Sequence, residues 1–372
     1  MSTPRTDAAW AVLDGRLYVI GGRSSGGVLL QSAEVFDPAT GWSAIAPLED
    51  PLAEARAVVL DEAIYLLGGR DAEGASDGVE VYRPDEDQWD SADNLGERRI
   101  GLAAGAVDDQ LFVLGGAGRD GVLLTSAERF QGGQWEPYPT WSLSPPRALA
   151  GSASLDGAIV VAGGFSGAGP LASVERFVPG EARESLPPLL QARGGLALAT
   201  DGAALFAVGG RDAANGRTVH VERLEAEADA WTALTPLPAA REGAAAAVLG
   251  ADLYVVGGTG EFGTVFASMV RLANVTVGAE DGPEPAAPAL ALAGPNPTRG
   301  PVRLRYTLLT PTEARLTVVD VRGREVAVLV QGSAAAGPHA ATWDASGLPA
   351  GVYAARLTTP AGAAVVRFVV VR

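Results

Sequence analysis

Residues 16–22 read RLYVIGG, and this pattern of alternating apolar residues closed by two glycines returns five more times. The later copies read AIYLLGG, QLFVLGG, AIVVAGG, ALFAVGG and DLYVVGG. The first glycines of the six doublets are Gly21, Gly68, Gly115, Gly163, Gly209 and Gly257, spaced 47, 47, 48, 46 and 48 residues apart. Such even spacing predicts a repeat architecture in which every copy is one structural unit.

Each copy is predicted to supply four antiparallel strands. Two short apolar runs precede the doublet, and Asp-Gly between them, as at Asp14-Gly15, is typical of a two-residue hairpin. A third strand follows a loop of variable sequence, and a fourth opens in four copies with Trp42, Trp89, Trp135 or Trp231. Six such sheets bury their faces when they are arranged radially. We expect residues 1–277 to form a six-bladed β-propeller that begins with strand one, ends with a fourth strand in blade six, and closes by blade packing without a shared strand.

The repeat resembles the kelch family. The resemblance rests on the six doublets, the tryptophans, and the aromatic residues that close strand three, which are Phe36, Tyr82, Phe130 and Phe177. It implies a kelch-type propeller and an all-β fold. It leaves the function open, because kelch propellers serve as adhesins, scaffolds, ligase adaptors and, in a few cases, enzymes.

An arginine recurs sixteen residues before the doublet in five of the six copies. These residues are Arg5, Arg99, Arg147, Arg193 and Arg241, with Leu52 in the remaining copy. Strand one is innermost in kelch propellers, and the loop between strands two and three opens on the same face as the link to the next blade. The five arginines should therefore surround one mouth of the central channel, flanked by Arg23, Arg70 and Arg211. Guanidinium groups suit carboxylates, so we predict that these eight arginines bind an extracellular glycan or an acidic protein segment.

A glutamate recurs on strand three and offers a purely structural alternative. Its copies are Glu34, Glu80, Glu128, Glu175 and Glu222, with Val270 in the last repeat. An arginine–glutamate ladder would satisfy buried polar groups and need bind nothing. Two other functions stay open: an enzyme acting on an acidic sugar, similar to kelch sialate mutarotases, with Glu242 as a proton-transfer group, or a structural envelope protein.

The composition excludes several classes of site. The chain has no cysteine and only two histidines, His220 and His339, so thiolate and histidine-rich metal centres are not expected. We assign no catalytic residue, cofactor or metal. The net charge of −16 disfavours a nucleic-acid partner. No apolar run is long enough to predict a membrane span.

The C-terminal quarter differs in character. Residues 278–293, rich in proline, alanine and acidic residues, predict a linker, and residues 294–372 predict about seven short strands in a β-sandwich. This last segment resembles the C-terminal sorting domain of type IX secretion cargo and the related hook-cap immunoglobulin-like domain. The matching positions are Pro295, Asn296, Pro297, Gly300, Asp320, Val321, Gly323, Arg324, Ala336, Gly337, His339, residues 348–353 and residues 367–372.

The resemblance implies delivery by the type IX secretion machinery to the outer-membrane surface or the extracellular space. Such cargo first crosses the inner membrane with a signal peptide. The opening MSTPRTDAAWAVLDG has one arginine and no apolar core, so it does not predict one. We expect that the signal has been trimmed or precedes this start.

Overall fold

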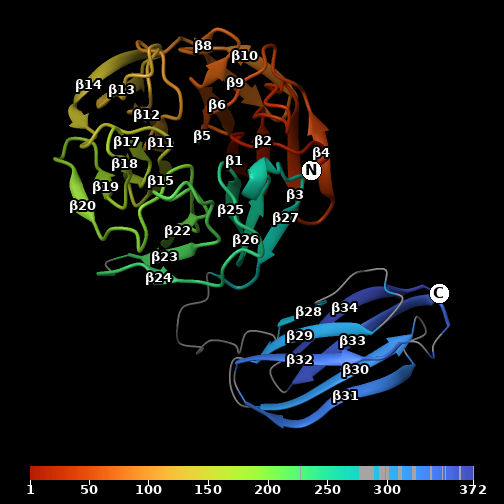
Figure 1. Ribbon diagram of the computed structural model, residues 1–372. Coiled ribbons are helices and arrows are strands. Elements are labelled where there is room, and N and C mark those ends of the chain that lie inside the picture. The colour runs from red at the N-terminus through yellow and green to blue at the C-terminus, as the bar shows by residue number, and fades with distance from the viewer. Residues whose placement is uncertain are drawn as a thin grey trace. The chain divides into compact units, whose positions relative to one another are not determined.

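The computed structural model describes residues 1–226, 228–275, 289–292, 298, 301–308, 312–320, 324–335, 337–345, 347, 349–359 and 362–371. The chain divides into two compact units, Met1–Thr276 and Val277–Arg372. Both units are built from antiparallel strands (Figure 1). The helical content of the described residues is one short 3₁₀ turn, Glu261–Gly263.

The first unit holds six radially arranged sheets, the blades of a propeller (Figure 1). The first strands of the blades are β1 (Ala9–Leu13), β5 (Arg56–Leu60), β11 (Ala103–Val107), β15 (Gly151–Leu155), β21 (Ala197–Thr200) and β25 (Ala245–Leu249). The second strands are β2 (Arg16–Ile20), β6 (Ala63–Leu67), β12 (Gln110–Leu114), β16 (Ala158–Ala162), β22 (Ala204–Val208) and β26 (Asp252–Val256).

The third strands are β3 (Ala33–Asp37), β9 (Val79–Arg83), β13 (Ser126–Gln131), β19 (Val174–Phe177), β23 (Val221–Glu225) and β27 (Met269–Leu272). The fourth strands are β4 (Gly41–Ile45), β10 (Gln88–Ser91), β14 (Gln134–Ser142), β20 (Glu184–Leu186) and β24 (Thr232–Ala233). Two small hairpins, β7–β8 (Arg70–Asp71 and Gly74–Ala75) and β17–β18 (Phe165–Ser166 and Gly169–Pro170), extend the loops of blades two and four. In the described residues blade six has three strands, where the sequence predicted four.

The first strands form the inner wall of the propeller. Each contacts the first strand of the next blade, and β25 of blade six contacts β1 of blade one. At this junction Leu17 and Val19 of blade one share a buried cluster with Ala245 and Tyr254 of blade six. Blades one and six therefore close the circle by packing against each other without a shared strand, as the sequence predicted.

Aromatic pairs explain the tryptophan at the start of strand four. Phe36 packs on Trp42 and Tyr82 on Trp89, with ring centroids 5.3 and 5.0 Å apart. Trp89 also donates from its indole Nε1 to the carbonyl of Ala46 in the preceding blade, at 2.9 Å. The tryptophan thus stabilises its own blade and the junction with its neighbour.

The second unit is a sandwich of two sheets, ordered β28–β29–β32 and β31–β30–β33–β34. Its strands are β28 (Ala289–Leu292), β29 (Val302–Leu308), β30 (Thr312–Asp320), β31 (Glu325–Ala334), β32 (Gly337–Trp343), β33 (Gly351–Thr359) and β34 (Gly362–Val370). Buried side chains from both sheets, among them Leu304, Leu316 and Phe368, form its core.

The expectation of a linker over residues 278–293 was wrong at its C-terminal end. Residues 289–292 form β28, which pairs antiparallel with β29. Leu290 and Leu292 pack against the core of the sandwich, and this burial holds a strand that is too short to be predicted from its own pattern. Residues 278–288 lie outside the described residues.

Candidate functional site

A ring of six residues, one from each blade, surrounds the channel at the start of the first strands. We call it the mouth ring; it consists of Asp7, Glu54, Gly101, Leu149, Gly195 and Gly243. Each backbone N–H donates to the carbonyl of the preceding member at 2.7 to 2.9 Å, so the hydrogen bonds form a closed circle. All six residues have φ between 54° and 65°. That left-handed backbone explains why glycine follows the arginine by two residues in three of the repeats.

The mouth ring leaves little space in the channel. Together with Trp10 and Arg56 it lines a cavity of about 50 Å³. A water molecule takes up roughly 30 Å³ of liquid, so this cavity suits one or two waters. Desolvation, reinforced by the nearby charges of Glu54 and Glu242, raises the pKa of Asp7 to about 7. The channel therefore holds a carboxyl group that titrates near neutrality, in a space far smaller than a sugar.

The five recurrent arginines are buried and do not reach the channel as a ligand-binding ring. Arg5, Arg99, Arg147, Arg193 and Arg241 are 0 to 3 % exposed. Every one of them donates to the carbonyl of the first doublet glycine in its own repeat, at 2.8 to 3.2 Å. Four also pair with the strand-three glutamate of the same repeat, at 2.6 to 2.9 Å; these pairs are Arg5–Glu34, Arg99–Glu128, Arg147–Glu175 and Arg193–Glu222.

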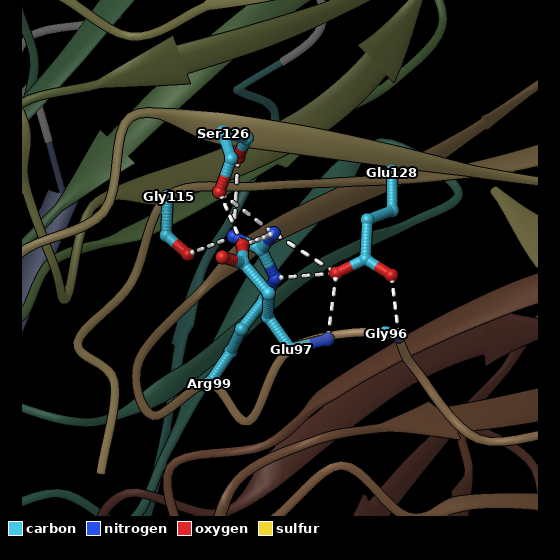
Figure 2. Close-up of polar contacts among 6 residues, drawn as sticks. All are labelled: Gly96, Glu97, Arg99, Gly115, Ser126 and Glu128. Carbon is cyan, nitrogen blue, oxygen red and sulfur yellow. Dashed lines mark hydrogen bonds and ion pairs between the residues drawn. The ribbon is translucent and has the colours of Figure 1, made fainter. Parts of the chain in front are cut away.

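Figure 2 shows one such arrangement around Arg99. Its guanidinium donates to Gly115, Ser126 and Glu128, while the Glu128 carboxylate also accepts from the backbone N–H groups of Gly96 and Glu97. The Arg99 guanidinium therefore has no donor left for an external ligand. The predicted contact of these five arginines with a glycan or acidic segment is therefore incorrect, because their side chains are at most 3 % exposed and their Nη groups donate to groups within the blades.

The same arginines join neighbouring blades through their backbone. The second glycine of each doublet donates to the carbonyl of the arginine, or of Leu52, in the next repeat, at 2.7 to 3.0 Å. A side chain on this glycine would collide with the start of the first strand of its own blade: at Gly69 a Cβ would lie 2.8 Å from the carbonyl oxygen of Ala53. We call each buried arginine with its glycine and glutamate partners an interblade clamp.

Two repeats hold only half of the ion pair. In blade six Arg241 has Val270 in place of the glutamate, and its guanidinium lies 4.4 Å above the ring of Phe266. In blade two the glutamate is present as Glu80, but Leu52 stands where the other repeats have arginine. Glu80 and Arg241 are consequently the two charged groups that the ladder leaves unmatched.

The comparisons with known proteins agree with this architecture. A family model described as the kelch motif matches residues 4–48, 51–96 and 146–188, and a secretion system C-terminal sorting domain matches residues 294–372. The chain is a kelch-repeat propeller with a C-terminal secretion sorting domain. Among solved structures, one titled "Structure of YjhT" is similar, with a TM-score of 0.63 and 15 % identity over 73 % of this chain and 96 % of that one. At that identity the likeness shows the fold alone. No curated protein matches the sequence.

The sorting domain indicates export by the type IX secretion machinery to the cell surface or the extracellular space. Two of its turns are held by internal hydrogen bonds. Asp320 accepts from the backbone and the guanidinium of Arg324 at 3.0 and 3.1 Å, and the Tyr353 hydroxyl donates to Pro349 at 2.9 Å. In the described part of the chain, no helix has the length and apolar character to cross a membrane.

The three flanking arginines of the kelch propeller lie beside carboxylates at the mouth. Arg23 and Arg70 both approach Glu54, and Arg211 pairs with Glu242 at 2.7 Å. Their side chains remain 26 to 40 % exposed. Glu242, considered above as a proton-transfer group, is thus held by Arg211 and by Arg217, which lies 3.3 Å away.

Sequence reasoning missed the apolar residues of this same face. We define the mouth face as the loops between second and third strands together with the links between blades. The four large apolar side chains that stand exposed on the described propeller all belong to it; they are Val28, Val122, Leu190 and Phe262. Val28 and Val122 occupy matching places in two similar stretches, GVLLQSAE and GVLLTSAE, whereas Leu190 and Phe262 have no large apolar counterpart in the other repeats.

Proposed function

We propose that this protein is a secreted or surface-displayed binding protein whose kelch propeller recognises a protein partner through the mouth face. The observation that carries the proposal is the gathering of Val28, Val122, Leu190 and Phe262 on one face. Their exposed fractions range from 56 to 99 %. Exposed apolar groups that gather on one side of a soluble domain mark interaction surfaces more often than chance placements do.

The half-exposed arginines give this face a second interface property. Arg23 and Arg70 lie beside Glu54 of the mouth ring and Arg211 lies beside Glu242, on the same face as the apolar loop tips. Arg211 also stacks on Phe165, with its guanidinium carbon 4.5 Å from the ring centroid. Arginine and aromatic side chains are enriched in protein–protein interfaces, where a polar rim surrounds apolar anchors. A protein segment with apolar residues flanked by carboxylates fits this surface.

The channel gives the enzyme alternative less support. Ligand pockets for small molecules usually have volumes of roughly 300 to 1,000 Å³, whereas the cavity at the mouth ring measures about 50 Å³. Asp7, Glu54 and Glu242 are close enough to influence one another's charge, but a sugar ring would not fit between them. Recognition at the mouth face needs no such cavity.

The absence of cysteine allows a direct test of the proposal. Val122→Cys would carry the only thiol of the full chain, to which a photo-crosslinker is attached, and Asp109→Cys in the opposite hairpin turn is the control. We expect the Val122 probe to crosslink one extracellular protein that the Asp109 probe does not. That protein is then purified and its Kd is measured by calorimetry.

Substitutions at the loop tips complete the test. Phe262→Asn and Val122→Ser should each weaken the complex at least tenfold, while Asp109→Ser leaves it unchanged. Asparagine is chosen for position 262 because Phe262 has φ of 57°, a conformation that asparagine tolerates. Equal affinity of all variants would overturn the proposal. A glycan array that binds wild type and both loop variants equally would also overturn it.

A further inference from the structure

The other repeats show which group lies beside the strand-three glutamate, and so which group is expected beside Glu80 in blade two. In four repeats a guanidinium lies against the strand-three glutamate and the first doublet glycine. Blade two keeps the glutamate, the glycine doublet and the strand pairing, with Leu66 opposite Glu80 in the β6–β9 ladder. It differs by Leu52, whose shorter apolar side chain carries no donor. These four repeats, which we call the sister blades, therefore show a guanidinium group at a position where the sequence of blade two supplies none.

The place that the guanidinium takes in the sister blades is an open cavity in blade two. The cavity has a volume of about 290 Å³ and is lined by Asp50, Leu52, Asp71, Ser76, Gly78 and Glu80, among others. We call it the blade-two slot. Its volume approaches the lower end of the range for small-ligand pockets, roughly 300 Å³.

The electrostatics of the slot favour a cation. Among the described residues Glu80 has no ion pair and no side-chain hydrogen bond. Burial, reinforced by the charges of Asp50 and Glu49, raises the pKa of Glu80 to about 7. Asp71 and Glu73 also line the slot. A cation placed there would remove the repulsion between these carboxylates.

The arrangement favours a planar organic cation over a metal ion. Within the described residues no three histidine, aspartate or glutamate side chains are grouped closely enough to hold a metal. The sister blades instead show a carboxylate and backbone carbonyls around one guanidinium fork: Arg193, for example, donates to Glu222 at 2.6 Å and to the Gly209 carbonyl at 2.8 Å. A fork of N–H donors matches such a set of acceptors better than a point charge does.

We propose that the blade-two slot binds a guanidinium group, as presented by an arginine side chain of another protein or by a small guanidine. The bound group would pair with Glu80 and complete the interblade clamp that blade two lacks. The slot opens between the Asp50–Leu52 link and the loop after the doublet, which places it on the mouth face. The proposal stands apart from the protein partner inferred above, because a small probe tests it without that partner.

Calorimetry on the full chain tests the slot. The probe is N-acetyl-arginine amide, compared with the citrulline analogue, which has the same shape without charge, and with the lysine analogue. We expect the arginine probe to bind at least tenfold more tightly than either analogue. Two further probes distinguish the two sources of the guanidinium group: a pentapeptide with a central arginine, and agmatine. Tighter binding of the pentapeptide indicates an arginine of another protein, and tighter binding of agmatine indicates a small guanidine.

Two variants place the probe in the slot. Leu52→Arg supplies the guanidinium from within the chain, so it should abolish probe binding and raise Tm. Glu80→Gln is an independent second variant, which should weaken probe binding at least tenfold and keeps the test valid if Leu52→Arg fails to fold. Leu52→Met is the control for Leu52→Arg, because it preserves an apolar side chain. No detectable binding of the arginine probe to wild type would overturn the proposal. Equal binding of the citrulline probe, or undiminished binding to Glu80→Gln, would overturn it as well.

Discussion

Arg193 and Glu222 form an ion pair whose side chains are 0 and 1 % exposed, with 2.6 Å between Nη1 and Oε1. The pair links strand three of blade five to Arg193. The backbone carbonyl of Arg193 in turn accepts a hydrogen bond from the N–H of Gly164 in blade four, at 3.0 Å. One side chain thus couples the interior of one blade to the edge of the next. Four blades repeat this arrangement, so the arginines that suggest a ligand site in the sequence are structural elements of the propeller.

Removing one partner of this pair should be costly. Arg193→Ala leaves Glu222 charged and buried, a situation that typically lowers the free energy of unfolding by about 3–5 kcal/mol. Urea unfolding of the full chain, followed by tryptophan fluorescence, measures the change. The control is Arg16→Ala, which breaks an exposed pair with Asp37 and should leave the stability close to that of wild type. Similar losses for both variants would contradict the structural role assigned to the interblade clamp.

The second doublet glycine should tolerate no side chain. Gly69→Ala places a Cβ 2.8 Å from both the Ala53 carbonyl oxygen and the Ala55 Cβ, at φ of 107°. Gly74→Ala, in the same blade, has φ of 121° but nothing within 4 Å. Both variants carry the left-handed penalty of about 1 kcal/mol, and Gly69→Ala adds a backbone collision. Thermal unfolding should therefore show a clearly lower Tm for Gly69→Ala, and equal Tm values would refute the close-approach argument.

Stability should fall as the pH rises toward neutrality. Folding raises the pKa of Asp7 from 3.8 to about 7, so the folded state keeps a proton that the unfolded chain has already lost. The free energy of unfolding then decreases between about pH 4 and pH 7 on account of this group and becomes level above. The charges that act on Asp7 are Glu54 and Glu242, which raise its pKa, and Arg23, which lowers it.

Asp7→Asn tests this dependence, because asparagine also accepts the left-handed backbone of the mouth ring. The variant should gain stability relative to wild type as the pH rises from 4 to 7. Asp109→Asn, at an exposed turn, should follow the wild-type curve. Parallel curves for Asp7→Asn and wild type in denaturant titrations at five pH values would show that Asp7 does not titrate in this interval.

The sorting domain should be required for export and dispensable for the fold of the propeller. A chain ending at residue 277 retains the whole of the first compact unit. Expressed in a host with type IX secretion and equipped with a signal peptide, it should accumulate in the periplasm with an unchanged Tm, while the full chain reaches the medium or the surface. Fractionation and immunoblotting measure this. Export of the truncated chain would refute the role of residues 294–372.

Much of the fold follows from residues that repeat. The doublets, the Asp-Gly turns and the tryptophans recur because each blade must solve the same packing problem, so one unit predicts the others. The same reasoning led to the prediction that the flanking arginines bind a ligand, which stays a prediction. It did not identify the strand at residues 289–292, because that short stretch gains its strand conformation from pairing with β29 and from burial of Leu290 and Leu292.

The sequence by itself determined the number of blades, the position of the innermost strand and the presence of a secretion tail, because each depends on local patterns that recur or match as a whole. It also showed that an arginine and a glutamate recur at fixed places in the repeats, with Leu52 and Val270 as the two departures. Only the tertiary structure decided what those charges do. Ion pairing and burial depend on which groups from distant segments meet. In the fold the five arginines of the expected binding ring are buried, four of them in interblade clamps, and a cavity lies beside Glu80.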